Sequence, residues 1–167
     1  MEGLKVRPYQ PSDAKEVWTL HNLALQAAGA HAGEGPWDDD LKNIEAAYLK
    51  AQGAFLVALI DGKIVGMGAF RPIDSCTVEI KRMRVHPAYQ RQGIGTAILQ
   101  QVEARARRRG YRKFTLDTTV QQIAAQKFYE KCGYHRRGRG ERGGFECILY
   151  DKEIDEGGDC LDWARAS

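Results

Sequence analysis

The stretch that decides the fold is Gln90-Arg91-Gln92-Gly93-Ile94-Gly95-Thr96, which lies between a segment typical of a strand and one typical of a helix. Its two glycines let the backbone turn tightly and approach a ligand closely. The helix that follows begins with N–H groups that lack a partner within the helix, and its dipole is positive at that end. Arg91 adds a forked donor. The stretch therefore predicts a site for an anion such as a pyrophosphate.

A Gly-x-Gly pattern at a helix start also has an explanation that involves no ligand. Glycines serve a tight turn from strand to helix in the same way. The stretch is too short for the Gly-x-Gly-x-x-Gly dinucleotide fingerprint, and no Lys-Ser or Lys-Thr pair follows as in a P-loop. The sequence around the stretch must therefore decide between the two explanations.

The strand expected before the stretch, over 76–85, has an unusual apolar pattern. Its apolar side chains alternate up to Ile80, but the next one is Met83, three positions further on. One extra residue near Lys81-Arg82 would keep Ile80, Met83 and Val85 on one face, which predicts a β-bulge that splays the strand from its neighbour. The alternative is that the strand ends or flips there.

The helix expected after the stretch is amphipathic. Ile94, Ile98, Val102 and Ala106 recur every four residues, so one face should pack on a sheet, and Gly110 is a suitable end. Over the whole chain, the expected order is strand, two helices, three strands, helix, strand, helix and two strands. This order predicts a mixed α/β (α+β) domain with seven strands and about four helices over residues 1–154, followed by a polar tail over 155–167.

The composition is that of an ordinary globular protein. Apolar residues make up 43% of the 167 residues, and the net charge of +3 is too small to indicate nucleic acid. No apolar run approaches the roughly 20 residues that span a bilayer, and the N-terminus lacks the apolar core of a signal peptide. These features predict a cytoplasmic protein that binds neither a membrane nor nucleic acid.

The cysteines and the charge clusters allow more limited inferences. The four cysteines form no Cys-x-x-Cys pair, so we expect reduced thiols and no metal site. Arginines cluster over 105–112 and 136–142, and the segment 34–40 is acidic. Each cluster is either a solvated face or a contribution to binding, with an anionic ligand on one side and a cationic amine on the other.

The run from Glu79 to Thr96 resembles the GNAT superfamily of acetyl-CoA-dependent N-acetyltransferases. The family's Q/R-x-x-G-x-G/A motif is matched by Gln90, Gly93 and Gly95, and the bulged strand before it ends at Val85-His86-Pro87. A second family motif is matched by Ala125-x-x-Phe-Tyr-Glu-Lys-x-Gly-Tyr134. The order and spacing of these elements agree with the family, and the resemblance covers residues 57–150.

The resemblance implies acetyl-CoA as the acetyl donor and a mostly antiparallel sheet whose central parallel pair is splayed. It implies that the pantetheine arm lies between those strands and pairs with the backbone of Met83, Arg84 and Val85. It also implies that the pyrophosphate binds the N–H groups of Arg91, Gln92, Gly93, Ile94, Gly95 and Thr96. A family asparagine that touches the cofactor is replaced here by Gln122, which leaves that contact open.

The resemblance also implies catalytic roles. Tyr129 occupies the position of the family's usual proton donor to the departing sulfur, and Glu79 that of a glutamate that acts as a base through water. Glu79 could instead be a salt-bridged strand residue, Tyr129 a core aromatic, and His86 is a weaker candidate base. The expected function is direct acetyl transfer to a primary amine of a small molecule or peptide, by a monomer or homodimer. The alternative is a non-catalytic acetyl-CoA sensor.

Overall fold

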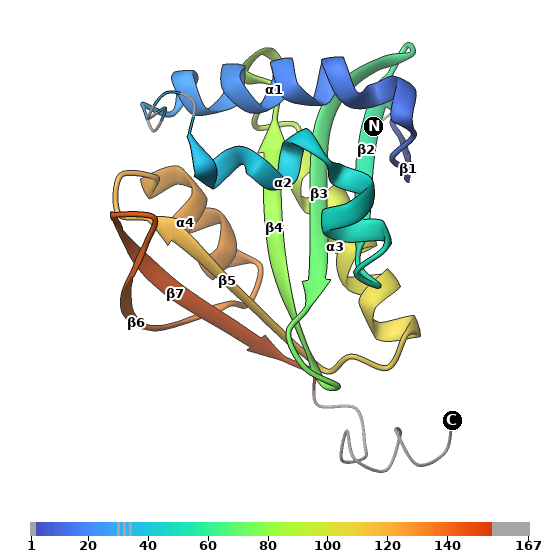
Figure 1. The fold of residues 1–167 in the computed structure, drawn as a ribbon. Coiled ribbons are helices and arrows are strands. Elements are labelled where there is room, and N and C mark those ends of the chain that lie inside the picture. Colours follow the sequence, from blue (N-terminus) through green and yellow to red (C-terminus); the bar gives the residue numbers. More distant parts are fainter. Residues whose placement is uncertain (1–2, 30, 32, 34, 155–167) are drawn as a thin grey trace.

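The computed structural model describes residues 3–29, 31, 33 and 35–154. Within this part of the chain, seven strands form one sheet in the order β1-β2-β3-β4-β5-β7-β6 (Figure 1). All neighbours are antiparallel except β4 and β5, which confirms the predicted mixed sheet. The strands are β1 Lys5–Pro8, β2 Ala54–Ile60, β3 Lys63–Pro72, β4 Thr77–Val85, β5 Lys113–Thr119, β6 His135–Arg142 and β7 Phe145–Glu153.

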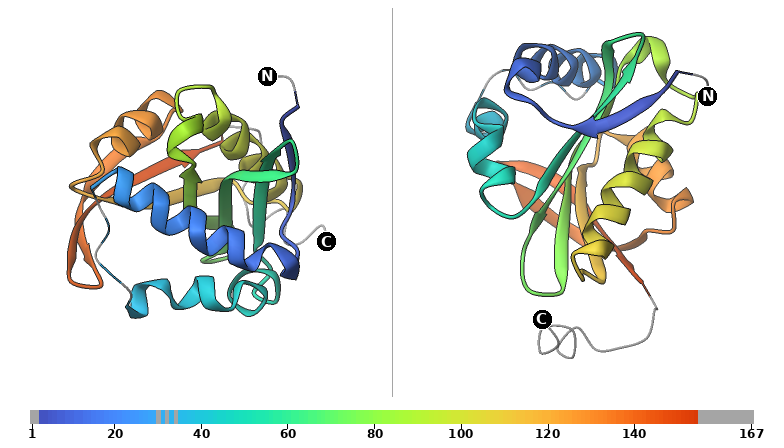
Figure 2. Two further views of the ribbon diagram at one scale, coloured as in Figure 1. Left: turned by 90° about the horizontal axis from the view of Figure 1, so that it is seen from above. Right: turned by 90° about the vertical axis from the view of Figure 1, so that its right-hand side faces the viewer.

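Helices cover both faces of the sheet. α1 and α2 lie over one face, and α3 and α4 lie over the other (Figure 2). The expected tail, 155–167, is outside the described residues. The helices are α1 Ala14–Ala27, α2 Asp39–Lys42, α3 Ile94–Arg108 and α4 Ile123–Lys131, with short helical turns at η1 Pro11–Asp13, η2 Pro36–Asp38, η3 Glu45–Leu49 and η4 Pro87–Tyr89.

The predicted apolar stripe of α3 is confirmed. Ile94, Ile98, Val102 and Ala106 are all buried against the sheet, in the core that also contains side chains from α4. A second core lies on the opposite face, between the sheet and the α1–α2 side. The sheet thus separates two cores.

The second helix differs from the single helix to about residue 51 that the sequence indicates. α2 ends at Lys42, and a one-turn π-helix, η3, follows it. Asn43 leaves helical geometry, with φ −147° and ψ 72°, and its side chain accepts a hydrogen bond from the N–H of Ala46 at 3.2 Å. Asparagine readily forms such local bonds in place of a continuous helix.

The bulge predicted near Lys81-Arg82 is confirmed. Met67 pairs with Arg84 and Ala69 pairs with Lys81, so β4 has one residue more than β3 between these pairs. Arg82 has φ +59°, in the left-handed region. Beyond the bulge, the side chains of Met83 and Val85 return to the α3 face, as the apolar pattern indicates.

β4 and β5 diverge along their length. They are paired only where Thr77–Glu79 lie beside Lys113–Thr115, near the start of each strand. Past this point no described residue pairs with β4 on the β5 side. The predicted splayed parallel pair is therefore present, and the gap that it opens contains the candidate site.

Two expectations from composition can be compared with the described residues. Cys132 and Cys147 are free thiols, as expected, whereas Cys76 is disulfide-bonded, which corrects that expectation for one position. Among the described helices, none combines the length and apolar character needed to cross a membrane.

Candidate active site

A cavity of about 1000 Å³ opens where β4 and β5 separate. Its walls come from β4, β5, the start of α4, the segment before α2 and the β6–β7 hairpin. Five residues predicted from the sequence line it together: Glu79, Met83, Arg84, Gln122 and Tyr129. Val85 and the segment Arg91–Thr96 are not part of this lining.

The start of α3 offers the donors that the sequence predicts. Gly93 has φ +81°, a conformation that favours glycine, and it precedes the first residue of the helix. Among the described residues, no group accepts a hydrogen bond from the N–H of Ile94, Gly95 or Thr96. These free amides and the positive end of a 15-residue helix suit a pyrophosphate.

Gly95 is not explained by packing within the protein. A Cβ built at this position would lie 3.4 Å from the Phe128 ring and 3.6 Å from Val85, which is ordinary contact. A small side chain would therefore fit beside α4.

Tyr129 brings a hydroxyl to the cavity from α4. Its ring is 6% exposed and packs edge-to-face against Phe128 and Tyr134, with centroids 5.2 and 5.6 Å away. The Oη atom makes no hydrogen bond with a described residue. Burial raises the pKa of this phenol well above its ordinary value, so the hydroxyl keeps its proton at neutral pH. Tyr129 is thus both a core aromatic and a free donor.

Glu79 lies at the cavity and also near two cations. Its side chain lines the cavity and lies 3.3 Å from Lys81 Nζ and 4.0 Å from Arg71 Nη2. The other candidate base, His86, accepts a hydrogen bond from the N–H of Ala88 at 3.0 Å, which caps the strand end. Glu79 remains the better placed of the two.

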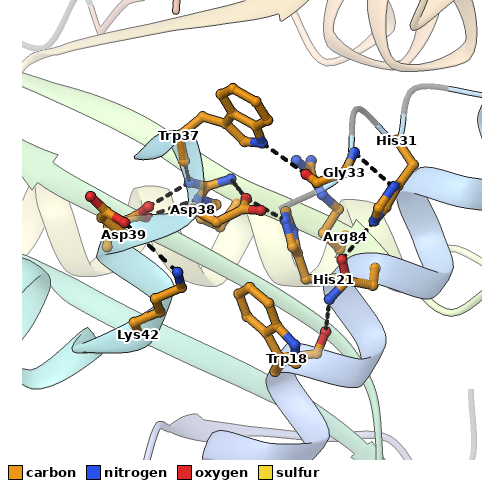
Figure 3. A network of polar contacts seen from close by, with 12 residues as sticks. Trp18, His21, His31, Gly33, Trp37, Asp38, Asp39, Lys42 and Arg84 are labelled. Atoms are coloured by element: carbon orange, nitrogen blue, oxygen red, sulfur yellow. Dashed lines mark hydrogen bonds and ion pairs between the residues drawn. The ribbon is translucent and has the colours of Figure 1, made fainter. Parts of the chain in front are cut away.

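The acidic segment before α2 is used within the protein. Asp38 is 2.9 Å from His21 Nε2 (Figure 3). Asp40 accepts hydrogen bonds from Arg82 and from Tyr48. Of the acidic residues described in this segment, only Asp39 is solvated, near Lys42. Asp38 and Asp40 are therefore neither simply solvated nor free to attract a cationic amine. Glu34, which belongs to the same acidic segment, lies outside the described residues.

His21 is a neutral hydrogen-bond donor in this network. It is fully buried, and burial, followed by the charges of Arg84 and Arg82, lowers its pKa to about 4. At neutral pH its Nε2–H therefore donates to Asp38, while Nδ1 is buried without a partner in the described structure. The contact with Asp38 is a hydrogen bond and not an ion pair.

Arg84 has a side-chain role that the sequence did not indicate. The resemblance assigned only its backbone, but its guanidinium lines the cavity beside His21 (Figure 3). Nη1 donates to the carbonyl of Met83 at 2.9 Å, whereas Nε is buried without a partner among the described residues. No described carboxylate lies within ion-pairing distance. Burial, followed by the charge of Arg82, lowers the pKa of this group to about 10.

The described residues thus combine free amides at a helix start, a gap between parallel strands and a cavity that contains a carboxylate and a phenol. Residues 15–134 match the family model described as the acetyltransferase (GNAT) family. The chain belongs to this family.

Two curated relatives cover the GNAT region. The chain is 38% identical over 104 residues to N-acetylaspartate synthetase of Danio rerio, covering 61% of this chain and 37% of that protein. It is 34% identical over 143 residues to human N-acetyltransferase 8, covering 77% of this chain and 61% of that protein. The chain therefore spans less than two thirds of the length of either relative.

Solved structures share the GNAT fold. An acetyltransferase from Streptococcus agalactiae superposes with a TM-score of 0.84 at 22% identity, covering 92% of this chain and 100% of that one. The PaiA N-acetyltransferase of Thermoplasma acidophilum, in complex with coenzyme A, superposes with a TM-score of 0.76 at 17% identity, covering 90% and 99%. At these identities the likeness concerns the fold.

Proposed function

We propose that this chain is an N-acetyltransferase that moves an acetyl group from acetyl-CoA directly to a primary amine of a small molecule or peptide. The observation that carries this proposal is the divergence of β4 from β5 beside the free amides that begin α3. Family membership and the names of both curated relatives, which describe acetylation at nitrogen, support it.

The residues present fit coenzyme A. The N–H groups of 91–96 would hold the pyrophosphate, and the unpaired edge of β4 at Met83, Arg84 and Val85 would pair with the pantetheine amides. Gln122 lines the cavity at the start of α4 and would reach the same arm. Bound in this way, the donor supplies an activated thioester at the gap between the strands.

Glu79 and Tyr129 would handle the protons of the reaction. An alkyl ammonium with a pKa of about 10 must lose its proton before it can attack, and Glu79 would accept that proton through a water. Tyr129 would donate a hydrogen bond to the sulfur as the carbon–sulfur bond breaks. Because burial raises the pKa of this phenol further above that of a thiol, hydrogen bonding is favoured over complete proton transfer.

Direct transfer requires no nucleophile from the enzyme. The free thiol of Cys132 is part of the apolar core, and burial raises its pKa, which makes it less reactive. Much of the rate would then come from alignment of the amine with the thioester in one cavity. The free backbone N–H groups near Met83 would polarise the thioester carbonyl.

The test is an acceptor screen. The protein is incubated with acetyl-CoA and a panel of amines, amino acids and peptides, while release of the free thiol and the mass of the product are followed. We expect thiol release that depends on the acceptor, with one acetyl group added per thiol. Calorimetry with acetyl-CoA is run in parallel, because binding without turnover on any acceptor would show a sensor and contradict the proposal.

A further inference from the structure

The guanidinium of Arg84 is a charged group in the cavity with no charged partner in the described part of the protein. One edge, at Nη1, is bound to the Met83 carbonyl. The other edge, formed by Nε and Nη2, makes no hydrogen bond with a described residue, and Nε is shielded from solvent. Because Nε has almost no accessible surface, a ligand in the cavity would meet the guanidinium at Nη2, whose charge-assisted N–H donors suit a carboxylate.

Arg82 provides an internal comparison. Arg82 lies two positions before Arg84 on the same strand, and its Nη2 donates to the carbonyl of Trp37 in the segment before α2. Its Nε is 2.9 Å from Asp40 Oδ2, and its Nη1 is 3.8 Å from Asp38 Oδ1. Among the described residues, the protein therefore supplies carboxylates for Arg82 and none for Arg84.

The side of the sheet on which Arg84 lies indicates which substrate meets it. The side chain points to the α1 side, next to His21, whereas Met83 and the start of α3 lie on the opposite face. The proposed path of coenzyme A runs along the α3 face and through the gap. A group that reaches the Arg84 guanidinium thus comes from the acceptor side of the cavity.

We propose that Arg84 binds a carboxylate of the acceptor, so that the substrates of this enzyme are amines that also carry a carboxylate, as amino acids do. This inference rests on the proposed acetyl transfer and narrows its acceptor class. His21, which is uncharged, and Asp38, which is already bonded to it, complete the wall beside the guanidinium. Arg84 is a specificity-determining residue and takes no part in proton transfer.

The test compares pairs of acceptors that differ only at the carboxylate. Glycine, leucine, aspartate and lysine are each compared with the corresponding α-carboxamide, and aspartate also with β-alanine, with thiol release as the readout. The amide keeps the size of the acid and has a less basic amine. We expect the wild type to prefer the acid in at least one pair by 100-fold or more in kcat/KM.

Two substitutions assign that preference to Arg84. Arg84→Gln should raise KM for the preferred acid by 100-fold or more, abolish discrimination within the pair and leave KM for acetyl-CoA unchanged. Arg84→Lys should restore part of the preference, since it keeps the charge without the fork. The matched control is Arg107→Gln, an exposed arginine on α3 away from the cavity, which should retain full discrimination.

The outcomes separate this inference from the proposed function. Equal kcat/KM values of the wild type for acids and amides would overturn the carboxylate site and leave the proposed acetyltransferase activity intact. The same holds if Arg84→Gln lowers kcat/KM equally for acids and amides. If no acceptor turns over, calorimetry of the same acids and amides with the coenzyme A complex decides. Binding of an acid that Arg84→Gln abolishes supports the site, and absence of acid binding to the wild type overturns it.

Discussion

Arg82 and Arg84 lie on the same side of β4, but in the described part of the chain only Arg82 is paired with carboxylates. Arg82 is held by Asp40 and Asp38, whereas Arg84 makes one hydrogen bond with a described residue, to the carbonyl of Met83. Two arginines of the same strand therefore differ in what they contribute to the folded state. One anchors the segment before α2 to the sheet, and the other faces the cavity.

This difference predicts opposite effects on stability. Arg82→Gln should lower the free energy of unfolding by about 3 kcal/mol, because it leaves two largely buried carboxylates without their cation. Arg84→Gln should leave it unchanged or raise it by up to about 1 kcal/mol, because a charge without a partner is costly to bury. Urea unfolding of both variants measures the two values. A loss of the same size for Arg84→Gln would contradict the unpaired state of this residue.

Tyr129→Phe isolates the hydroxyl. We expect kcat to fall by about 100-fold, within the usual range for a proton donor, with unchanged affinity for acetyl-CoA. Stability should change little, since Oη has no hydrogen-bond partner among the described residues and the ring contacts remain. Steady-state kinetics and calorimetry separate the two effects. Equal losses of rate and binding would assign the residue to cofactor binding instead.

Glu79→Gln tests the proposed base. The variant should lose at least 10-fold in kcat/KM for the amine at pH 7, because a carboxamide cannot accept the proton. Activity should recover as the pH approaches the pKa of the amine, where the neutral form is present without a base. A pH profile of kcat/KM from 6 to 10 for wild type and variant gives this comparison. Parallel profiles would indicate that Glu79 is only an ion-pairing residue.

Replacement of Gly93 tests the pyrophosphate site. Gly93→Leu should abolish binding of acetyl-CoA in calorimetry while the protein stays folded, with a strain cost of about 1–2 kcal/mol from its φ of +81°. Gly62→Leu is the matched control, because Gly62 has φ +77° in the β2–β3 turn and open space around it. The control should lose similar stability and bind acetyl-CoA normally. If Gly93→Leu bound acetyl-CoA normally, the proposed pyrophosphate site at the start of α3 would be wrong.

The buried His21 predicts a pH dependence of stability. Its pKa is about 4 in the folded protein against an ordinary value of 6.5, so the unfolded chain takes up the proton first as pH falls. Its contribution is complete above pH 6.5 and is lost between pH 6.5 and 4, by roughly 3 kcal/mol. Asp13 and Asp40, whose pKa values lie below 3.8, act only at lower pH. Urea unfolding at pH values between 4 and 6.5 measures this contribution. The free energy of unfolding of His21→Gln should fall less steeply with decreasing pH than that of the wild type.

The bulge in β4 and the start of α3 were predictable because they depend on local patterns. The four-residue period of α3, the Gly-x-Gly before it and the three-residue step from Ile80 to Met83 are each properties of a short segment. Backbone geometry converts them directly into a helix face, a turn and a bulge. The continuous second helix was wrong, because one asparagine side chain interrupts it.

The sequence by itself determined the order of the elements along the chain, the bulge in β4 and the start of α3, since each follows from periodicity and spacing within a few residues. Only the tertiary structure decided which charges neutralise one another. Asp40 meets Arg82 across 42 positions of the chain, whereas no described carboxylate pairs with Arg84. Such pairing depends on how distant segments pack, and no pattern within a single segment specifies it.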